Sequence, residues 1–291
     1  VRPPQSADAA ALTAIATPHL IRQTMAQTNG RFWTLTQRAQ PIGYAALLPL
    51  PGLPHLFELT GGITPEFRRQ GAGSFLWRTL RAELARTAAA AGSGQSVPQI
   101  THTVSGLDTP AACFLQHHHF TLEHEEWTMQ LDDLPAASFP PSPIPTNLPG
   151  TLKSWGQAVA GRSLPSLYKR CFTGRPWCQP YTAAEIAATW EPGDELVTLK
   201  VGSDTVGFAW LHFAEPGTAQ LEPVGIVLEK QGMGYGRFLL TAILQQLQNQ
   251  GIQTVSLGVW ANNETAIRLY QSLGFVHQSS SYSLTYTIPP T

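Results

Sequence analysis

The sequence predicts an α+β protein made of two similar domains in tandem, each with a mixed central β-sheet flanked by helices. Three observations support this prediction. A proline-rich segment divides the chain near its middle, two blocks on one side of it recur on the other, and each half alternates short strand-like runs with amphipathic helical runs.

The proline-rich segment covers residues 132–150, where six of 19 residues are proline. Proline fixes φ and lacks an amide donor, so the segment disfavours both helix and sheet. We therefore expect an N-terminal domain at 1–134, an extended linker at 135–150 and a C-terminal domain at 151–291.

The repeat consists of two collinear blocks. A strand, a glycine-rich turn and an amphipathic helix at 224–251 recur 163 residues earlier, at 61–92, and residues 266–275 match 111–120 at an offset of 155. A Gly/Ser-rich loop after the helix of the first half absorbs the difference, since such loops tolerate insertions. The two halves should therefore share one fold.

The periodicity predicts the same order of elements in each half. In the first half we expect a helix at about 8–28, strands at 31–37, 41–49 and 55–63, a helix at 72–90, a strand at 98–104 and a short helix at 109–117. In the second half we expect a helical region at about 164–190, strands at 195–201, 205–214 and 218–227, a helix at 235–249, a strand at 252–259 and a short helix at 263–272. A pair of strands should close each half.

Charge and composition exclude several function classes. The 18 Lys and Arg nearly balance the 19 Asp and Glu, and neither half has the basic excess that nucleic-acid binding needs. No apolar run is long enough to cross a membrane, and the first residues do not resemble a secretory signal. The three cysteines form no CxxC pair, which favours a reducing, cytoplasmic setting. Residues His117–His119 cannot converge on one metal ion from consecutive positions, so we expect no metal.

The turn QGMGYG at 231–236 lies where a strand ends and a helix begins. Glycine lets the backbone approach an anion, and the helix N-terminus adds positive potential, so a pyrophosphate fits here. The spacing matches neither the Rossmann nor the P-loop pattern. A tight turn without a ligand is the alternative.

Gln231-x-x-Gly234-x-Gly236 resembles the R/Q-x-x-G-x-G/A acetyl-CoA signature of the GNAT superfamily, and Arg68-x-x-Gly71-x-Gly73 resembles it again. The run from Asn263 to Tyr270, followed by Leu-Gly-Phe, resembles the N-x-x-A-x-x-L-Y…GF block of the same superfamily. The tandem layout resembles two-domain members of the mycothiol synthase type, without implying mycothiol chemistry. The resemblance covers nearly the whole chain and implies acetyl transfer from acetyl-CoA to a small amine.

The resemblance also implies which residues contact the cofactor. In the second half these are Val224, Gly225, Ile226, Gln231, Gly232, Met233, Gly234, Tyr235, Gly236, Arg237 and Asn263. A possible second acyl-CoA site in the first half comprises Gly61, Gly62, Ile63, Arg68, Arg69, Gln70, Gly71, Ala72, Gly73 and Ser74. Asn263 is equally suited to helix capping, and Arg237 to solvent exposure.

Acyl transfer to an amine needs a base for the amine and an acid for the leaving thiolate. By the resemblance, Tyr270 is the acid candidate, although a packing aromatic is the alternative. Glu222 is the base candidate, and a structural salt bridge is its alternative. Strand alternation should place Gln220, Glu222 and Val224 on one face and Leu221 on the other, with a local disturbance at Pro223 as the alternative.

The first half has Leu59 and Leu115 where the second has Glu222 and Tyr270. We therefore expect the N-terminal domain to be catalytically silent, whether or not it binds CoA. Tyr168, Arg175, Trp177 and Tyr181 are candidates to line the acceptor pocket, or else they pack the domain. A non-catalytic acyl-CoA-binding regulatory protein is the alternative function. The sequence does not predict the oligomeric state.

Overall fold

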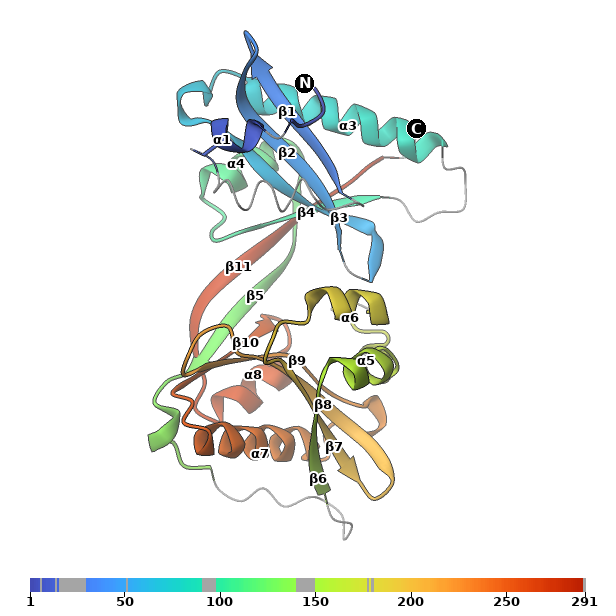
Figure 1. The fold of residues 1–291 in the computed structure, drawn as a ribbon, viewed down its shortest axis with the longest axis vertical. Coiled ribbons are helices and arrows are strands. Elements are labelled where there is room, and N and C mark those ends of the chain that lie inside the picture. The colour runs from blue at the N-terminus through green and yellow to red at the C-terminus, as the bar shows by residue number, and fades with distance from the viewer. Residues whose placement is uncertain are drawn as a thin grey trace. The chain divides into compact units, whose positions relative to one another are not determined.

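The computed structural model describes residues 1–5, 7–13, 15, 30–50, 52–90, 98–139, 150–176, 178 and 181–289 (Figure 1). Contacts divide the chain into two compact units. The first unit comprises Val1–Glu123 with Ser283–Thr291, and the second unit comprises His124–Tyr282.

The first unit contains a sheet in the order β1-β2-β3-β4, with the end of β11 (Val276–Thr287) beside β4. Strands β1, β2 and β3 are antiparallel, whereas β3 and β4 are parallel. Its elements are α1 (Asp8–Ala11), β1 (Arg31–Gln37), β2 (Gln40–Leu50), β3 (Leu53–Ile63), η1 (Pro65–Phe67), α3 (Ala72–Ala90), β4 (Gln99–Val104) and α4 (Pro110–His117).

The second unit repeats this plan in the order β6-β7-β8-β9-β10, with β5 (Thr121–Leu131) beside β10. Strands β6 to β9 are antiparallel, β9 and β10 are parallel, and β10 and β5 are antiparallel. Its elements are η2 (Leu134–Ala136), β6 (Gly150–Trp155), α5 (Gln157–Phe172), α6 (Ala183–Thr189), β7 (Glu195–Val201), β8 (Asp204–His212), β9 (Thr218–Ile226), η3 (Leu228–Lys230), α7 (Tyr235–Asn249), β10 (Thr254–Trp260) and α8 (Glu264–Gln271).

Helices cover both faces of the sheet in the second unit, with α5 and α7 on opposite sides (Figure 1). The end of β9 shows this at adjacent residues, because a Cβ on Gly225 would meet Phe172 of α5, whereas Ile226 lies beside Gly236 of α7. On its inner face α7 buries Leu240, Leu244 and Leu247, the i, i+4, i+7 spacing of an amphipathic helix. Each such leucine contributes on the order of 1.5–3 kcal/mol.

The predicted α+β class with a mixed, helix-flanked sheet in each half is confirmed, but the expected pair of closing strands is wrong. Each half instead ends in one long strand, β5 (Thr121–Leu131) or β11 (Val276–Thr287). Neither contains a glycine or proline that could form a hairpin turn. Both strands have residues in each unit, which places the division at Glu123 and Ser283.

The bounds of two expected helical regions differ from those in the structure. The helical region expected from residue 164 begins at Gln157, after a strand, β6, that was not predicted. Of the helix expected at 8–28, Asp8–Ala11 is helical and 16–29 lie outside the described residues. No helix in the described ranges is long and apolar enough to span a membrane.

The described part of the expected linker packs against the second unit. The side-chain amide of Gln248 in α7 donates to the carbonyl oxygens of Leu134, Pro135 and Ala137, and Phe139 is buried. Residues 140–149 lie outside the described ranges. The domain boundaries 1–134, 135–150 and 151–291 stay a prediction.

Candidate active site

The glycine-rich turn of the second unit has the backbone that anion binding needs. Gly232 and Gly234 have φ of 73° and 84°, in the left-handed region that favours glycine. No atom lies within 4 Å of a Cβ built on either residue, so the approach to the turn is open. Gly234 caps α7 without a side-chain bond, which leaves the first-turn amides of the helix to face an anion. The turn therefore has the open backbone that an anionic group such as a pyrophosphate requires.

Gln231, the first residue of the turn motif, acts through its side chain as well as its backbone. Its Nε2 donates to the carbonyl oxygen of Ile226 at 2.9 Å and to that of Cys171 at 3.3 Å, which ties the turn to the end of β9 and to α5. Arg68 makes the matching bond in the first unit, from Nε to the carbonyl oxygen of Ile63 at 2.8 Å. The first residue of each motif therefore holds the turn against the strand before it.

Close packing explains two further glycines of the site. A Cβ on Gly225 would lie 2.9 Å from the rings of Phe172 and Phe208, and one on Gly236 would lie 3.3 Å from Leu269 of α8. Helices α5 and α8 can therefore lie close to the strand end and to the start of α7.

Strands β9 and β10 pair from Thr218↔Thr254 to Gln220↔Ser256, and no pair follows toward Glu222. Parallel strands that part in this way leave backbone groups for a ligand. The Glu222 side chain accepts a hydrogen bond from Gln220 Nε2 at 3.0 Å.

The expected alternation along β9 is wrong at Val224. The register opposite β8 runs Ala209↔Val224 and then Leu211↔Leu221, so β9 carries one extra residue at Glu222–Pro223. Such a bulge shifts the side-chain phase by one. Val224 therefore shares a face with Leu221 rather than with Glu222.

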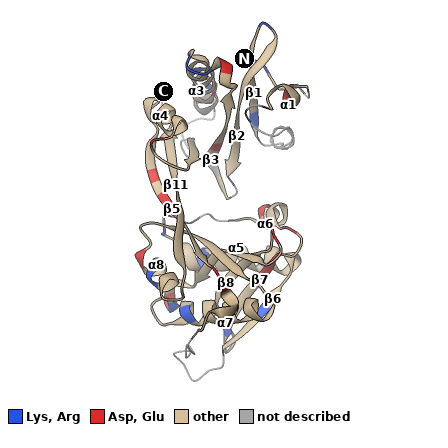
Figure 2. Cartoon of the chain, turned by 90° about the vertical axis from the view of Figure 1, so that its left-hand side faces the viewer, with Lys and Arg blue, Asp and Glu red and all other residues tan. Residues whose placement is uncertain are grey.

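Glu222 has a carboxylate neighbour that the sequence did not suggest, Glu126 of β5. A Cβ on Gly258 of β10 would lie 2.8 Å from Glu126 Oε1 and 3.1 Å from Glu222 Oε2, so both carboxylates converge on this glycine. Figure 2 shows acidic positions in red along β5. Glu126 lies inside the range expected for the other domain, which is why sequence reasoning missed it.

These carboxylates influence the groups around them. Burial, and then the charge of Glu222, raise the pKa of Glu126 to about 7. Burial and the charge of Glu222 also raise the pKa of Tyr270 to about 12, and burial, Glu222 and Glu185 raise that of Tyr181 to about 12. Glu222 is therefore electrostatically close to Glu126 and to both phenols.

Tyr270 lies on α8 and is 8% exposed, with its ring 6.0 Å from that of Phe275. Its hydroxyl has no hydrogen-bond partner among the described residues. A buried phenol that only packs normally satisfies its hydroxyl. The position therefore suits a hydroxyl reserved for a ligand.

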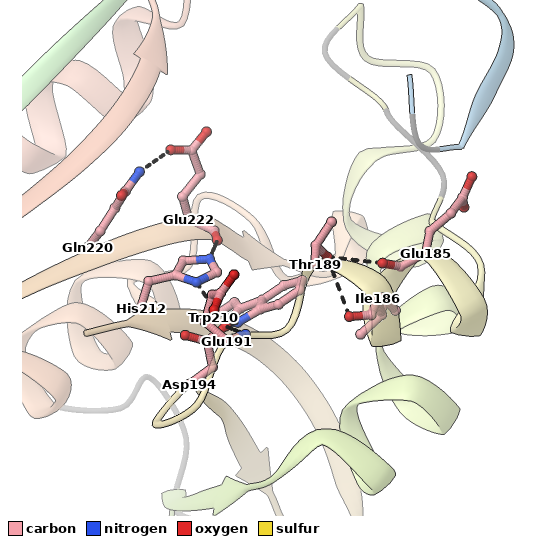
Figure 3. A network of polar contacts seen from close by, with 9 residues as sticks. All are labelled: Glu185, Ile186, Thr189, Glu191, Asp194, Trp210, His212, Gln220 and Glu222. Carbon is pink, nitrogen blue, oxygen red and sulfur yellow. Dashed lines mark hydrogen bonds and ion pairs between the residues drawn. The ribbon is translucent and has the colours of Figure 1, made fainter. Parts of the chain in front are cut away.

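A polar network contacts the backbone of Glu222 through its carbonyl oxygen (Figure 3). His212 of β8 places Nε2 at 3.2 Å from the Glu222 carbonyl oxygen and Nδ1 at 2.9 Å from Asp194 Oδ2. The buried Asp194 also accepts from Trp210 Nε1 at 3.0 Å and from the Glu191 amide at 3.0 Å.

The other residues expected to contact the cofactor lie around the turn. Asn263 caps α8, where its side-chain oxygen accepts from the Ala266 amide at 3.4 Å, so its capping role is present. Arg237 is bonded to Ser272 Oγ, Met233 is 45% exposed and Tyr235 is buried.

The residues expected to line the acceptor pocket separate into different roles. Tyr168 is buried beside the rings of Phe172 and Phe208 and is a core residue. Arg175 donates to Gln231 Oε1 at 3.2 Å. Tyr181 packs edge-on against Tyr168 at 5.3 Å and is close to Glu222, whereas Trp177 lies outside the described residues.

The first unit has the turn without the reactive groups. Gly71 has φ of 83° with nothing within 4 Å of its Cβ, and Gly73 packs against Phe114. Leu115 is buried where the second unit has Tyr270. The remaining expected contacts lie on the end of β3, on the turn and at the start of α3, and comprise Gly61, Gly62, Ile63, Arg69, Gln70, Ala72 and Ser74.

His118 packs edge-on against Phe114, and its Nε2 lies 2.9 Å from Ser74 Oγ. In the ranges that the structure describes, no three His, Cys, Asp or Glu residues are grouped as metal ligands would be.

Comparison with known proteins identifies the domain type. The family model described as "Acetyltransferase (GNAT) family" matches residues 7–98 and 162–275, well over half of the chain. The mycothiol acetyltransferase of Arthrobacter sp. (strain FB24) is 27% identical over 223 residues, which cover 73% of this chain and 65% of that protein. The mycothiol acetyltransferase of Paenarthrobacter aurescens (strain TC1) is 36% identical over 99 residues, 32% of this chain and 31% of that protein. In both cases the match spans less than two thirds of the relative.

A solved structure has a similar fold. It is described as a tandem GNAT protein from the clavulanic acid biosynthesis pathway, without AcCoA. It superposes with a TM-score of 0.60 at 18% identity and covers 100% of this chain and 90% of that chain. At this identity the likeness concerns the fold alone.

Proposed function

The chain belongs to the GNAT acetyltransferase family, and on that premise we propose that its second unit transfers the acetyl group of acetyl-CoA to a small amine. The observation that carries the proposal is that Glu222 lies close to both Glu126 and Tyr270, in the same unit as the open glycine turn. A protein that only sensed acyl-CoA would not need these proton-handling groups.

The residues that would hold acetyl-CoA are those whose backbone is open to it. The amides from Gly232 to Arg237 would face the pyrophosphate. The stretch of β9 at Val224–Ile226, which pairs with β8 and not with β10, would face the pantetheine arm, with Asn263 as a further contact. When bound, acetyl-CoA supplies a thioester whose acyl carbon an amine attacks.

Two proton transfers fall to side chains of this unit. The Glu222 carboxylate accepts a proton from the attacking amine, and the Tyr270 hydroxyl gives one to the departing sulfur. Burial and the charge of Glu222 raise the pKa of Tyr270 to about 12, so the phenol keeps its proton until a thiolate takes it. Asp194 and His212 fix the backbone at Glu222 and thus the direction of its carboxylate.

The first unit keeps the turn and lacks both transfer groups, so we assign it no chemistry. Leu59 and Leu115 are hydrocarbon side chains that cannot move a proton. CoA binding there, without turnover, is compatible with the open Gly71 turn.

The test is a screen of primary amines for thiol release that depends on acetyl-CoA. We expect release with at least one amine, together with a mass increase of that amine by one acetyl group. Saturable CoA binding without thiol release across the library would contradict the proposal and favour a regulatory acyl-CoA-binding protein.

A further inference from the structure

We propose that Glu126 is a second catalytic carboxylate, which together with Glu222 binds the ammonium group of a cationic acceptor and takes up its first proton. The inference rests on the proposed acetyl transfer and names the acceptor class, an amine with a second positive charge and no carboxylate beside it.

The geometry places Glu126 in the site. In the β5–β10 register Glu126 lies opposite Trp260, and Thr128 lies opposite Gly258, so Glu126 and Gly258 point to the same face. The missing Cβ of Gly258 makes the space into which Glu126 and Glu222 both extend. The first unit has no such glycine, because the β3–β4 register puts Thr103 where the second unit has Gly258.

The neighbouring Glu125 is a glutamate on the same strand whose carboxylate is satisfied by hydrogen-bond donors of the protein. Its Oε1 accepts from Trp127 Nε1 at 2.9 Å and from Ser280 Oγ at 2.7 Å, which lowers the pKa of Glu125. Within the described residues, Glu126 has no hydrogen-bond donor and neither Glu126 nor Glu222 has a Lys or Arg partner. A half-buried carboxylate that faces another carboxylate without a donor costs free energy unless a proton or a cation joins it.

The described residues around Glu126 do not supply this cation, so the cation is left to a ligand. Strand β9 contributes Glu222, and Glu222 in turn lies near Tyr270 of α8 and Tyr181 of the segment before α6. On β5 itself, the ring of His124 stacks on that of Trp260 at 3.8 Å. Two carboxylates beside aromatic rings suit an ammonium ion.

The same contacts argue against an acceptor that carries a carboxylate near its amine. Arg175, the cation that would have bound it, is hydrogen-bonded to Gln231 at the turn. A second negative charge would lie beside Glu126 and Glu222, where like charges repel.

The proton balance closes with these residues. The bound ammonium gives one proton to Glu126 and becomes a neutral amine. As the carbon–nitrogen bond forms and the carbon–sulfur bond breaks, the amine gives a second proton to Glu222, and the sulfur takes the proton of Tyr270. Glu222 then returns its proton to Tyr270, and Glu126 releases one proton to solvent. The overall reaction of an ammonium with a thioester yields an amide, a thiol and that one proton.

The experiment measures binding of butane-1,4-diamine in the absence of acetyl-CoA, by calorimetry at pH 7 in two buffers of different ionisation enthalpy. Burial and the charge of Glu222 raise the pKa of Glu126 to about 7, so a bound cation displaces a fraction of a proton from it. Wild type and the matched control Glu125→Gln should release that proton. Glu126→Gln should release none and should bind at least about 10-fold more weakly, as expected for loss of one partner of a buried charge pair. In wild type, 4-aminobutanoate should bind at least about 10-fold more weakly than the diamine.

A second variant covers the case in which Glu126→Gln fails to fold. Gly258→Ala displaces only the flexible ends of Glu126 and Glu222, and it should also weaken diamine binding. Unchanged affinity and proton release in either folded variant would overturn the inference. Absence of acetyl transfer by wild type, with diamine binding as described, would instead contradict the proposed function.

Discussion

The Nδ1–H of His102 in β4 donates to the carbonyl oxygen of Leu59 in β3, at 2.6 Å. The parallel pairs Phe57↔Ile100 and Ala219↔Val255 stand at corresponding places in the two units, so Leu59 matches Leu221 and His102 matches Leu257. Glu222 lies in the bulge that follows Leu221, and Thr103 stands where the second unit has Gly258. The first unit therefore lacks the glycine beside which two carboxylates meet in the second. This difference, together with the missing acid and base, is the physical basis for proposing that the chemistry belongs to one unit.

Alanine at the turn glycines should separate the two units. Gly234→Ala should lower CoA affinity of the second unit by at least about 10-fold, because the added Cβ obstructs the approach of the ligand to the turn. Its left-handed φ also adds strain of about 1–2 kcal/mol, which lowers stability rather than affinity. Gly71→Ala, with the same geometry in the first unit, should leave turnover unchanged. The measurements are CoA titration by calorimetry and steady-state thiol release.

Gly251→Ala is the matched control for strain, since Gly251 follows α7 with φ of 80° and an open Cβ position. It should cost similar stability and leave CoA affinity unaltered. Equal loss of affinity in Gly251→Ala and Gly234→Ala would argue against binding at the turn.

Asp194→Ala should destabilise the second unit by about 2–4 kcal/mol, because the Trp210 indole, the Glu191 amide and His212 lose a buried acceptor. It should also lower kcat more than it raises KM, since Glu222 loses its orientation. Urea unfolding and steady-state kinetics check the two effects. The exposed Asp204→Ala should stay within about 0.5 kcal/mol of wild type.

The two adjacent glutamates of β5 should shift stability in opposite directions with pH. The folded-state pKa of Glu126 is raised from its ordinary 4.5 to about 7, so the folded state binds more protons in that window and this group makes stability fall as pH rises through it. Glu126→Gln should remove that fall and stabilise the protein at pH 8 by roughly 1–2 kcal/mol, less than the full shift because the carboxyl keeps part of its hydration.

The pKa of Glu125 is lowered, first by its bond from Ser280, so its contribution is present above its ordinary pKa and is lost as pH falls. Glu125→Gln should therefore lose a little stability at pH 8 and none at low pH. Thermal unfolding of both variants between pH 4 and 9 measures the contrast, and the same sign for both would contradict the described environments.

The sequence predicted the repeated fold because each half carries a complete set of local signals. The ranges of β1, β7, α3 and α7 agree with those signals, because the spacing of apolar residues distinguishes a strand from a helix within a few residues. No local signal predicts that β5 and β11 each have residues in both units. The sequence of a strand that continues into the other unit does not differ from that of an ordinary strand.

The candidate site was predictable only in part for the same reason. The glycines of the turn and Tyr270 stand in recognisable motifs, whereas Glu126 comes from a strand 96 residues before Glu222. The bulge at Glu222–Pro223 could be suspected from the proline, but its effect on Val224 needed the register. The alternation of His124, Glu126 and Thr128 along β5 is the one sequence signal that could have pointed to a carboxylate on the site's face.

Single-turnover acetyl transfer by Tyr270→Phe and Glu222→Gln, followed from pH 6 to 10 with an accepted amine, tests the central claim most directly. Under these conditions the chemical step, rather than product release, is observed. Tyr270→Phe should slow the step about 10²–10⁴-fold at every pH, because no phenol protonates the sulfur, with CoA affinity nearly unchanged. Glu222→Gln should be slow at pH 7 and recover as pH rises, because solvent then supplies neutral amine. Wild-type rates in both folded variants would contradict the assignment of acetyl transfer to this site.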